Sequence, residues 1–310
     1  MQRFILAVLA IFFIAVIVTN QSTAVNIHED AGTRGAQLLK IAVGAKAVGM
    51  GESHVAAADD VYATYWNPAG LGYVETNQLG FMHNEWFEGI RYEFLGYVQP
   101  LSNIGTMAAT ISYISMGELD KTDETGKDMG QFHPYDILIG LSFGRKLNDV
   151  ISFGINAKFL REQIDEENAQ AFAADIGGIY AIPNSNLVLG ANVQHIGTKM
   201  KFISESYSLP LNLKFGAAYR LIDGTLTLAA EVNRPVDNDV SLGFGAEYKL
   251  KGIINFRTGY IYTMGGNDLG AVSGLRAGLG VDIRSYKLDY AFVPYGDLGQ
   301  AHRISLIASF

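Results

Sequence analysis

The stretch VSLGFGAEYKL, residues 240–250, alternates strictly between two kinds of side chain. Its even-numbered positions are apolar or aromatic, whereas its odd-numbered positions are Ser, Gly, Gly, Glu and Lys. Successive side chains of a β-strand point to opposite faces, so this period of two predicts a strand with one apolar and one polar face. The fold class then depends on how far the pattern continues along the chain.

The same alternation recurs from residue 76 to the C-terminus, for example over residues 151–159 and 275–284. It predicts about fourteen strands, most of them about ten residues long or longer, the length that a tilted crossing of a bilayer needs. The expected strands are residues 76–85, 90–100, 103–116, 133–145, 149–163, 169–182, 186–197, 208–220, 224–234, 238–250, 253–264, 273–284, 285–295 and 301–310.

The connections between these strands alternate in length. Those after even-numbered strands are short turns such as 100–102 and 183–185, whereas most of the others are longer, such as 117–132 and 198–207. Short periplasmic turns and longer outer loops are typical of outer-membrane barrels, so both ends of the barrel are expected in the periplasm.

The composition helps to separate two architectures that share this alternation, a membrane barrel and a soluble β-sandwich. Hydrophobic residues make up 49% of the chain and charged residues only 17%, with 35 Gly and no Cys. Strands that tile the chain, with aromatic residues at many strand ends, favour a closed antiparallel transmembrane β-barrel. The net charge of −8, without a basic stripe, argues against binding of nucleic acid.

The N-terminus has the features of a secretory signal peptide. A basic start at Arg3 precedes an apolar run from Phe4 to Val18 and a small-residue exit that ends at Ala24. We expect cleavage after residue 24 and export to the outer membrane of a Gram-negative-type envelope; the alternative is an uncleaved anchor. The C-terminal strand places Ile304, Leu306 and Phe310 on one face and ends in an aromatic residue, which resembles the signal that the barrel assembly machinery reads; the alternative is an ordinary edge strand.

Charged residues on the polar faces are expected to line the barrel lumen, because charges facing lipid are unfavourable. They carry both signs, which fits structural ion pairs better than a selective transport path. The expected lumen-facing charges are Lys158, Glu231, Glu247, Arg257, Arg276, Asp282, Lys287 and Arg303.

Before the first strand lies GAKAVGMGESHVAAADDVYATYWNPAGLG, residues 44–72. No Lys-Ser or Lys-Thr follows its glycines, and no G-x-S-x-G frames Ser53, so neither a phosphate loop nor a nucleophile elbow is indicated. His54 beside Asp59 and Asp60 is a weak metal set, and a solvated turn with a helix cap at Asp59 or Asp60 is the favoured interpretation. We expect no catalytic residue, cofactor or metal.

The same stretch has the features of a structural segment that packs inside the barrel. A helical turn or two, with Trp66 on one side, is broken by Asn67-Pro68-Ala69-Gly70. Residues 25–75 are too few for a domain but enough for a plug inside the barrel, which gives three expected parts: signal peptide 1–24, plug 25–75 and barrel 76–310. Small residues would allow the plug to pack closely against the wall.

The stretch closely resembles the N-terminal signature of the FadL-like outer-membrane superfamily, and in particular of the PorV/PorQ family. The match covers the plug and both ends of the chain, with Lys46 in place of the usual Arg. The resemblance implies a fourteen-stranded barrel with an N-terminal hatch. The plug positions that carry the resemblance are Gly44, Gly49, Met50, Gly51, Asp59, Asp60, Trp66, Asn67, Pro68, Ala69 and Gly70.

The resemblance implies two candidate functions. PorV-like proteins serve the type IX secretion system, where the barrel binds or shuttles secreted cargo and meets other secretion-system subunits. FadL-like relatives instead take up long-chain fatty acids and other hydrophobic small molecules. An enzyme is not expected. Besides cargo or ligand, the expected partners are outer-membrane lipid and the barrel assembly machinery.

Overall fold

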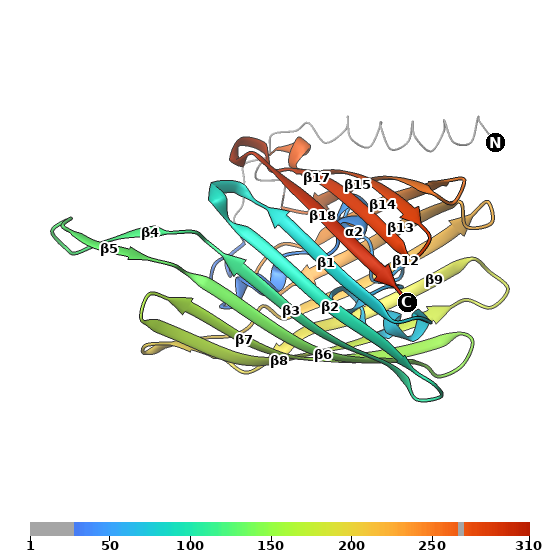
Figure 1. Cartoon of the computed structure of the whole chain (residues 1–310), viewed down its shortest axis with the longest axis horizontal. Helices are drawn as coiled ribbons and strands as arrows, with labels where there is room; N and C mark the ends of the chain where they lie inside the picture. Colours follow the sequence, from blue (N-terminus) through green and yellow to red (C-terminus); the bar gives the residue numbers. More distant parts are fainter. Residues whose placement is uncertain (1–27, 266–269) are drawn as a thin grey trace.

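The structure is a computed structural model that describes residues 28–265 and 270–310. The expected signal peptide, and residues 25–27 of the expected plug, lie outside the described residues. Fourteen of the described strands form one closed antiparallel barrel, in the order β1-β18-β17-β16-β15-β14-β13-β12-β9-β8-β7-β6-β3-β2 (Figure 1). The predicted fold class is therefore confirmed.

The barrel strands agree with the predicted strands to within a few residues. Their bounds are β1 Gln78–Glu85, β2 Arg91–Leu101, β3 Gly105–Ser115, β6 Tyr135–Lys146, β7 Ile151–Ile164, β8 Glu167–Ala181, β9 Leu187–Gly197, β12 Asn212–Leu221, β13 Leu226–Pro235, β14 Ser241–Leu250, β15 Ile254–Thr263, β16 Leu275–Ile283, β17 Tyr286–Pro294 and β18 Gln300–Ser309. β12 begins later than expected, directly after Pro210 and Leu211, because a proline cannot donate a hydrogen bond to a strand ladder.

The barrel closes where its first and last strands pair. Gln78 of β1 lies opposite Ser309 of β18, and Glu85 lies opposite His302. This pairing leaves no free strand edge, which a barrel in lipid requires because every backbone N–H and C=O must find a partner within the protein.

The alternation of the sequence is reproduced as two faces of the wall. Along β7 every second residue from Ser152 to Leu160 is buried, and the residues between them point outward and are mostly exposed. Outward aromatic residues gather near the ends of strands that meet at the short connections, among them Tyr97, Tyr180, Tyr219, Tyr248 and Tyr286. We call this the short-turn end of the barrel and the opposite end the long-loop end.

Two of the long loops contain strands of their own, which the sequence did not indicate. β4 (Leu119–Thr122) and β5 (Asp128–Phe132) form a ribbon that projects far beyond the barrel (Figure 1). β10 (Met200–Phe202) and β11 (Glu205–Tyr207) form a shorter one. Both ribbons lie at the long-loop end.

The remaining elements are short helical turns. η3 (Phe87–Gly89), η4 (Ala271–Gly274) and η5 (Gly296–Leu298) lie in loops at the long-loop end. η1 (Gln37–Lys40), α2 (Ala45–Gly49), α3 (Ala63–Trp66) and η2 (Pro68–Tyr73) belong to the N-terminal segment. Among the described residues, no helix has the length and apolar character that a membrane-spanning helix needs.

Candidate functional site

The N-terminal segment, residues 28–77, runs through the inside of the barrel from one end to the other. Near its start, the N–H of Gly35 donates to the carbonyl of Ser208 in a loop at the long-loop end. Near its end, Tyr73 lies under the ammonium of Lys146 at the short-turn end, 4.3 Å from the ring centroid. Nearly all residues between Val43 and Leu71 are buried. The boundary at residue 75 between plug and barrel stays a prediction.

Only short helical turns form in this segment, and side-chain hydrogen bonds hold the backbone at the start of η2 and just before α3. The carboxylate of Asp60 accepts the N–H of Tyr62 at 2.9 Å, just before α3. The side-chain oxygen of Asn67 accepts the N–H of Ala69 at 3.1 Å and starts η2, where Pro68 takes the first helical position. Asn67-Pro68 therefore ends one turn and begins another.

Glu231 on β13 attaches the middle of the segment to the wall through two backbone N–H groups. One carboxylate oxygen accepts the N–H groups of both His54 and Val55 at 2.8 Å, and the other pairs with the ammonium of Lys214 at 2.8 Å. Lys214 also lies 4.6 Å from the ring centroid of Trp66. Hydrogen bonds to a charged acceptor are among the stronger ones, so this contact fixes the middle of the segment.

Further inward-pointing side chains hold the backbone of the segment between Ala42 and Ala69. They satisfy N–H and C=O groups that the irregular backbone cannot pair within itself. The contacts are Gln78 to the N–H of Val61 at 2.9 Å, Ser305 to the N–H of Ala45 at 3.1 Å, Arg303 to the carbonyl of Ala42 at 2.6 Å, Asn156 to that of Thr64 at 3.0 Å, Gln194 to that of Tyr65 at 2.6 Å, Asn192 to that of Trp66 at 2.9 Å and Ser152 to that of Ala69 at 2.7 Å.

Of this set, the sequence indicated only Arg303 as a lumen-facing residue, because only charged residues were considered as candidates. The available signal was the period of two, which already assigned these neutral polar side chains to the inner face.

Asn67 reaches into the wall itself. Its amide donates to the carbonyl of Val55 at 2.8 Å and to that of Gly178 at 3.1 Å. The wall permits this approach because it carries glycines there: a Cβ on Gly177 would meet the Asn67 oxygen at 2.0 Å, and one on Gly190 would meet the Val55 carbonyl at 2.3 Å. The glycines of the inner face thus match the bulk of the segment.

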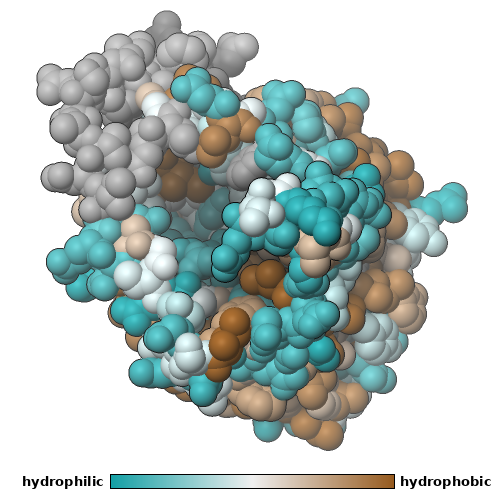
Figure 2. Space-filling model, turned by 90° about the vertical axis from the view of Figure 1, so that its left-hand side faces the viewer, coloured by the Kyte–Doolittle hydropathy of each residue, from teal (hydrophilic) through white to brown (hydrophobic). Residues whose placement is uncertain are grey.

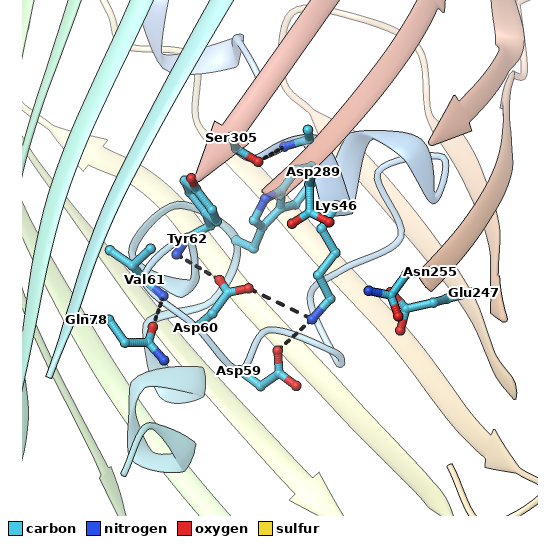
Figure 3. Close-up of polar contacts among 12 residues, drawn as sticks. Lys46, Asp59, Asp60, Val61, Tyr62, Gln78, Glu247, Asn255, Asp289 and Ser305 are labelled. Atoms are coloured by element: carbon cyan, nitrogen blue, oxygen red, sulfur yellow. Dashed lines mark hydrogen bonds and ion pairs between the residues drawn. The ribbon is translucent and has the colours of Figure 1, made fainter. Parts of the chain in front are cut away.

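Lys46, Asp59 and Asp60 form a charged cluster inside the segment (Figure 3). The Lys46 ammonium lies 2.8 Å from Asp59 and 3.9 Å from Asp60. Burial lowers the pKa of Lys46, but the two carboxylates outweigh burial and raise it above its usual range. The expectation of a solvated turn is wrong for Asp60, which is only 2% exposed because the turn faces the lumen, where the Asp60 carboxylate accepts the N–H of Tyr62.

Among the described residues, ligand atoms of His54, Asp59 and Asp60 lie within 4.8 Å of one another. Burial, together with the charge of Lys46, lowers the pKa of His54 to about 3, so its ring is neutral at physiological pH. The ammonium of Lys46 already pairs with both carboxylates. The arrangement therefore has the chemistry of a structural ion cluster.

The expected lumen-facing charges are placed as follows. Lys158, Glu231, Glu247, Arg257, Arg276 and Arg303 are buried, whereas Asp282 and Lys287 are half-buried near the short-turn end. Arg257 lies 2.6 Å from Glu247 and 2.5 Å from Asp289, and Lys158 lies 2.5 Å from Asp175. Arg276 donates to the carbonyls of Ser273 and Leu275 at 2.5 and 2.8 Å. Most of these charges are thus already paired within the protein.

A cavity of about 600 Å³ lies at the long-loop end, between the start of the segment at His28–Asp30 and the ends of β12 and β13. The two cavities found further along the segment are small. One cavity of about 20 Å³ lies beside Tyr65 and Lys158, and another of about 20 Å³ lies beside Glu52 and Glu231. Each has room for about one water molecule. Neither holds a lipid-sized molecule.

Two residues of the expected C-terminal signal lie on the outer face of β18, and the third, Phe310, follows directly after that strand. Ile304, Leu306 and Phe310 are exposed, and the N–H of Phe310 donates to the carbonyl of Asn77 at 3.0 Å. Phe310 also stacks on Tyr97 of β2, with 6.5 Å between the ring centroids. The last residue therefore continues the seam between the two ends of the barrel.

Comparison with known proteins gives a family and a fold. A family model described as type IX secretion system protein PorV matches residues 25–236. No curated protein matches the chain.

Among solved structures, the Pseudomonas putida toluene transporter TodX is similar with a TM-score of 0.60 at 13% identity, over 86% of this chain and 97% of that one. The Ralstonia pickettii toluene transporter TbuX has a TM-score of 0.59 at 14% identity over 86% and 97%. A Pseudomonas aeruginosa FadL homologue has 0.52 at 13% over 86% and 98%. At these identities the structural likeness shows a shared fold.

Proposed function

Because the chain belongs to the PorV family of type IX secretion system proteins, we propose that it binds exported cargo at the outer membrane and holds it at the cell surface. The family match is the observation that carries this proposal. A closed barrel whose lumen is occupied by its own N-terminal segment fits a binding platform better than a pore. We propose no catalytic role.

The long-loop end is the side that we assign to cargo. It carries the projecting β4–β5 ribbon, in which Asp120, Asp123, Glu124 and Asp128 are exposed, together with Leu119 and Met129. Lys121 of this ribbon pairs with Asp165 in the neighbouring loop. Figure 2 shows this end as a hydrophilic rim around a hollow in which hydrophobic residues are visible. Such a mixed surface can bind a folded protein domain.

The test removes the ribbon and leaves the barrel intact. We would replace residues 119–131 by a short Gly-Ser linker and measure exported proteins bound to the purified outer-membrane chain. The expected result is a strong loss of bound cargo. The matched control keeps the whole ribbon and carries Lys251→Ser in the turn at the short-turn end. Unchanged cargo binding in the ribbon variant would contradict the assignment of cargo to this end.

Uptake of hydrophobic small molecules is the second candidate, and one observation favours it. A concavity of about 560 Å³ lies on the outer wall of β7, β8, β9 and β12, lined by apolar residues such as Phe153, Tyr180 and Phe215. Behind it, only the glycine-rich wall separates the concavity from Asn67. Mass spectrometry of the purified barrel decides between the candidates: bound fatty acid supports uptake, and co-purified exported proteins support cargo binding.

The remaining parts of the chain receive roles that follow from the same proposal. Residues 25–75 would be the plug, residues 1–24 the signal peptide, and Ile304, Leu306 and Phe310 the signal for the barrel assembly machinery. A Phe310→Ser variant tests the last role: it should reach the periplasm but insert poorly. Normal insertion would show that Phe310 is not needed as an assembly signal, and it would not change the conclusion about the fold.

A further inference from the structure

The concavity on the outer wall has a shape that the register of four neighbouring strands sets. Phe153 of β7 lies opposite Gly178 of β8, Gly178 lies opposite Ala191 of β9, and Ala191 lies opposite Phe215 of β12. The outward positions of this row are therefore large, small, small and large. We call the space between the two phenyl rings the wall groove.

The neighbouring rows of the wall carry larger side chains. Towards the short-turn end, Tyr180 lies opposite both Ile151 and Leu189. Towards the long-loop end, Ile176 lies opposite Val193. The wall groove is thus bounded on all four sides, and its volume of about 560 Å³ is within the range of about 300–1,000 Å³ that is typical of ligand pockets.

The wall groove does not lead into the lumen, because its floor is a closed part of the wall. On the inner side, a Cβ on Gly190 would meet the carbonyl of Val55 at 2.3 Å. On the outer side, a Cβ on Gly178 would meet no atom nearer than the carbonyl of Ser152, at 3.9 Å. A molecule in the groove therefore rests against the outside of the barrel.

The lining of the wall groove fits hydrocarbon. Its side chains are apolar or aromatic except for Ser152, whose hydroxyl points inward and donates to the carbonyl of Ala69 at 2.7 Å. An empty groove would leave the lining atoms without dispersion contacts on one side. Flexible acyl chains can fill such an irregular surface, whereas a flat protein wall would bridge over it.

The depth of the wall groove places it in one leaflet. Tyr180 and Tyr219 belong to the outward aromatic residues of the short-turn end, which mark the level of the lipid headgroups. Gly178 lies two residues further into the wall than Tyr180, which at about 3.3 Å per residue and a tilt of about 40° is about 5 Å. The groove is therefore at the level of the first part of the acyl chains.

A cation lies at the rim of the wall groove. Arg145, the second-last residue of β6, is exposed and lies opposite Phe153. It follows the outward Phe143 by two residues, so it also points outward. The charges of Lys146 and Asp149 in the adjoining turn cancel, which leaves one net positive charge here. A guanidinium can donate two parallel hydrogen bonds to a phosphate.

We propose that the wall groove holds the acyl chains of one glycerophospholipid from the leaflet at the short-turn end, with the lipid phosphate at Arg145. In the orientation expected from the loop lengths, this is the periplasmic leaflet. The groove is two strands wide, about 10 Å, which suits the paired chains of a phospholipid better than the single chain of a fatty acid. The proposal does not depend on the cargo-binding role.

A photoactivatable phospholipid tests the site. The purified full-length barrel would be reconstituted in phosphatidylcholine vesicles that contain a small share of phosphatidylethanolamine with a diazirine near the ester end of one acyl chain. After illumination, mass spectrometry of peptides locates the adducts. We expect the peptides that carry Phe153 and Phe215 to be labelled about tenfold more than the outer face of β3, a preference that corresponds to about 1.4 kcal/mol. Equal labelling of both regions would overturn the proposal.

A variant that fills the groove provides the matched comparison. Gly178→Phe places a phenyl ring in the groove and should fold, because the space beside Gly178 on the outer side is open. Labelling at Phe153 and Phe215 should fall about tenfold. Ala109→Phe, at an exposed outward position of β3, adds the same ring elsewhere on the wall and should leave this labelling unchanged. Unchanged labelling in Gly178→Phe would also count against the site.

Charge variants test the position of the phosphate. Arg145→Gln should weaken labelling by the phosphatidylethanolamine probe several-fold, and Arg145→Lys should restore most of it, because a phosphate binds either cation. If Arg145→Gln labels as strongly as the unaltered protein, the headgroup does not lie at Arg145 and that part of the proposal is wrong.

Lipids retained by the barrel from native outer membranes identify the source of the ligand. Native mass spectrometry should find one glycerophospholipid per barrel, and Gly178→Phe should lose it. Three results would overturn the proposal: a bound free fatty acid, which would support uptake instead; bound lipopolysaccharide, which belongs to the other leaflet; or no retained lipid. Binding of exported proteins is measured separately with the ribbon variant, so either proposal can fail while the other stands.

Discussion

At the scale of single residues, the account rests on wall side chains that bind the backbone of the N-terminal segment. Glu231 has several partners at once, because one carboxylate oxygen accepts two backbone N–H groups and the other accepts the ammonium of Lys214. Removal of one partner of a buried charge pair leaves the other charge without compensation, which is more damaging than the pair is stabilising.

The first prediction follows from this contact. Glu231→Ala should destabilise the folded barrel by about 3 kcal/mol or more and expose the amides around His54 to solvent. Hydrogen exchange of residues 50–60 in detergent measures the local effect, and urea unfolding measures the global one. Glu205→Ala, on the exposed β11 ribbon, is the control. Equal protection of residues 50–60 in both variants would contradict the attachment.

The second prediction concerns pH. His54 has a pKa of about 3 in the folded protein and an ordinary value of 6.5. Between these values the unfolded chain binds a proton that the folded chain does not, so the folded state loses stability as the pH falls. At about pH 5 the loss should reach about 2 kcal/mol relative to neutral pH.

A His54→Gln variant lacks this proton and isolates the effect. Urea unfolding of the two proteins at neutral pH and at about pH 5 should show the larger acid-induced loss in the wild-type chain. If both proteins lose the same free energy of unfolding, His54 is not buried in its neutral form.

At the scale of elements, the strands were predictable and the path of the N-terminal segment was not. The alternation of residues 240–250 involves only residues that are neighbours in the sequence, so β14 could be predicted directly from it. The contact between His54 and Glu231 joins residues 177 positions apart, and no local pattern indicates it. The ribbons in the long loops were missed for a related reason, since short polar strands without a buried face carry little periodicity.

The glycines of the wall give a matched test at this scale. Gly190 and Gly178 lie on neighbouring strands but face opposite sides: a Cβ on Gly190 would meet the Val55 carbonyl at 2.3 Å, whereas one on Gly178 would meet only the Ser152 carbonyl, at 3.9 Å. Gly190→Ala should therefore destabilise the barrel by about 1–3 kcal/mol through overpacking. Gly178→Ala should leave it nearly unchanged.

The measurement is the free energy of unfolding of both variants in the same detergent. A smaller effect for Gly190→Ala than for Gly178→Ala would mean that the segment does not lie against the inner wall at this point.

At the scale of the whole molecule, the closed wall and the occupied lumen together determine what the protein can do. The outer wall is mostly apolar, most inward-facing charges are paired, and the two cavities of about 20 Å³ beside Tyr65 and Glu52 leave no room there for a large solute. Binding is then left to the surfaces, and we assign cargo to the long-loop end.

An occupied lumen also predicts the electrical behaviour of the barrel. Planar bilayers that contain the purified chain should show little or no steady conductance. Variants that weaken the attachment of the segment, such as Glu231→Ala, should show channel openings. Large, stable conductance of the unaltered protein would contradict a filled barrel.

The central claim is that this barrel carries exported proteins at the outer membrane. It is tested most directly by purifying the chain from native outer membranes under mild detergent and identifying every bound molecule by mass spectrometry. The account predicts that exported proteins are bound to the purified chain. A preparation that contains hydrophobic small molecules and no exported protein would contradict it.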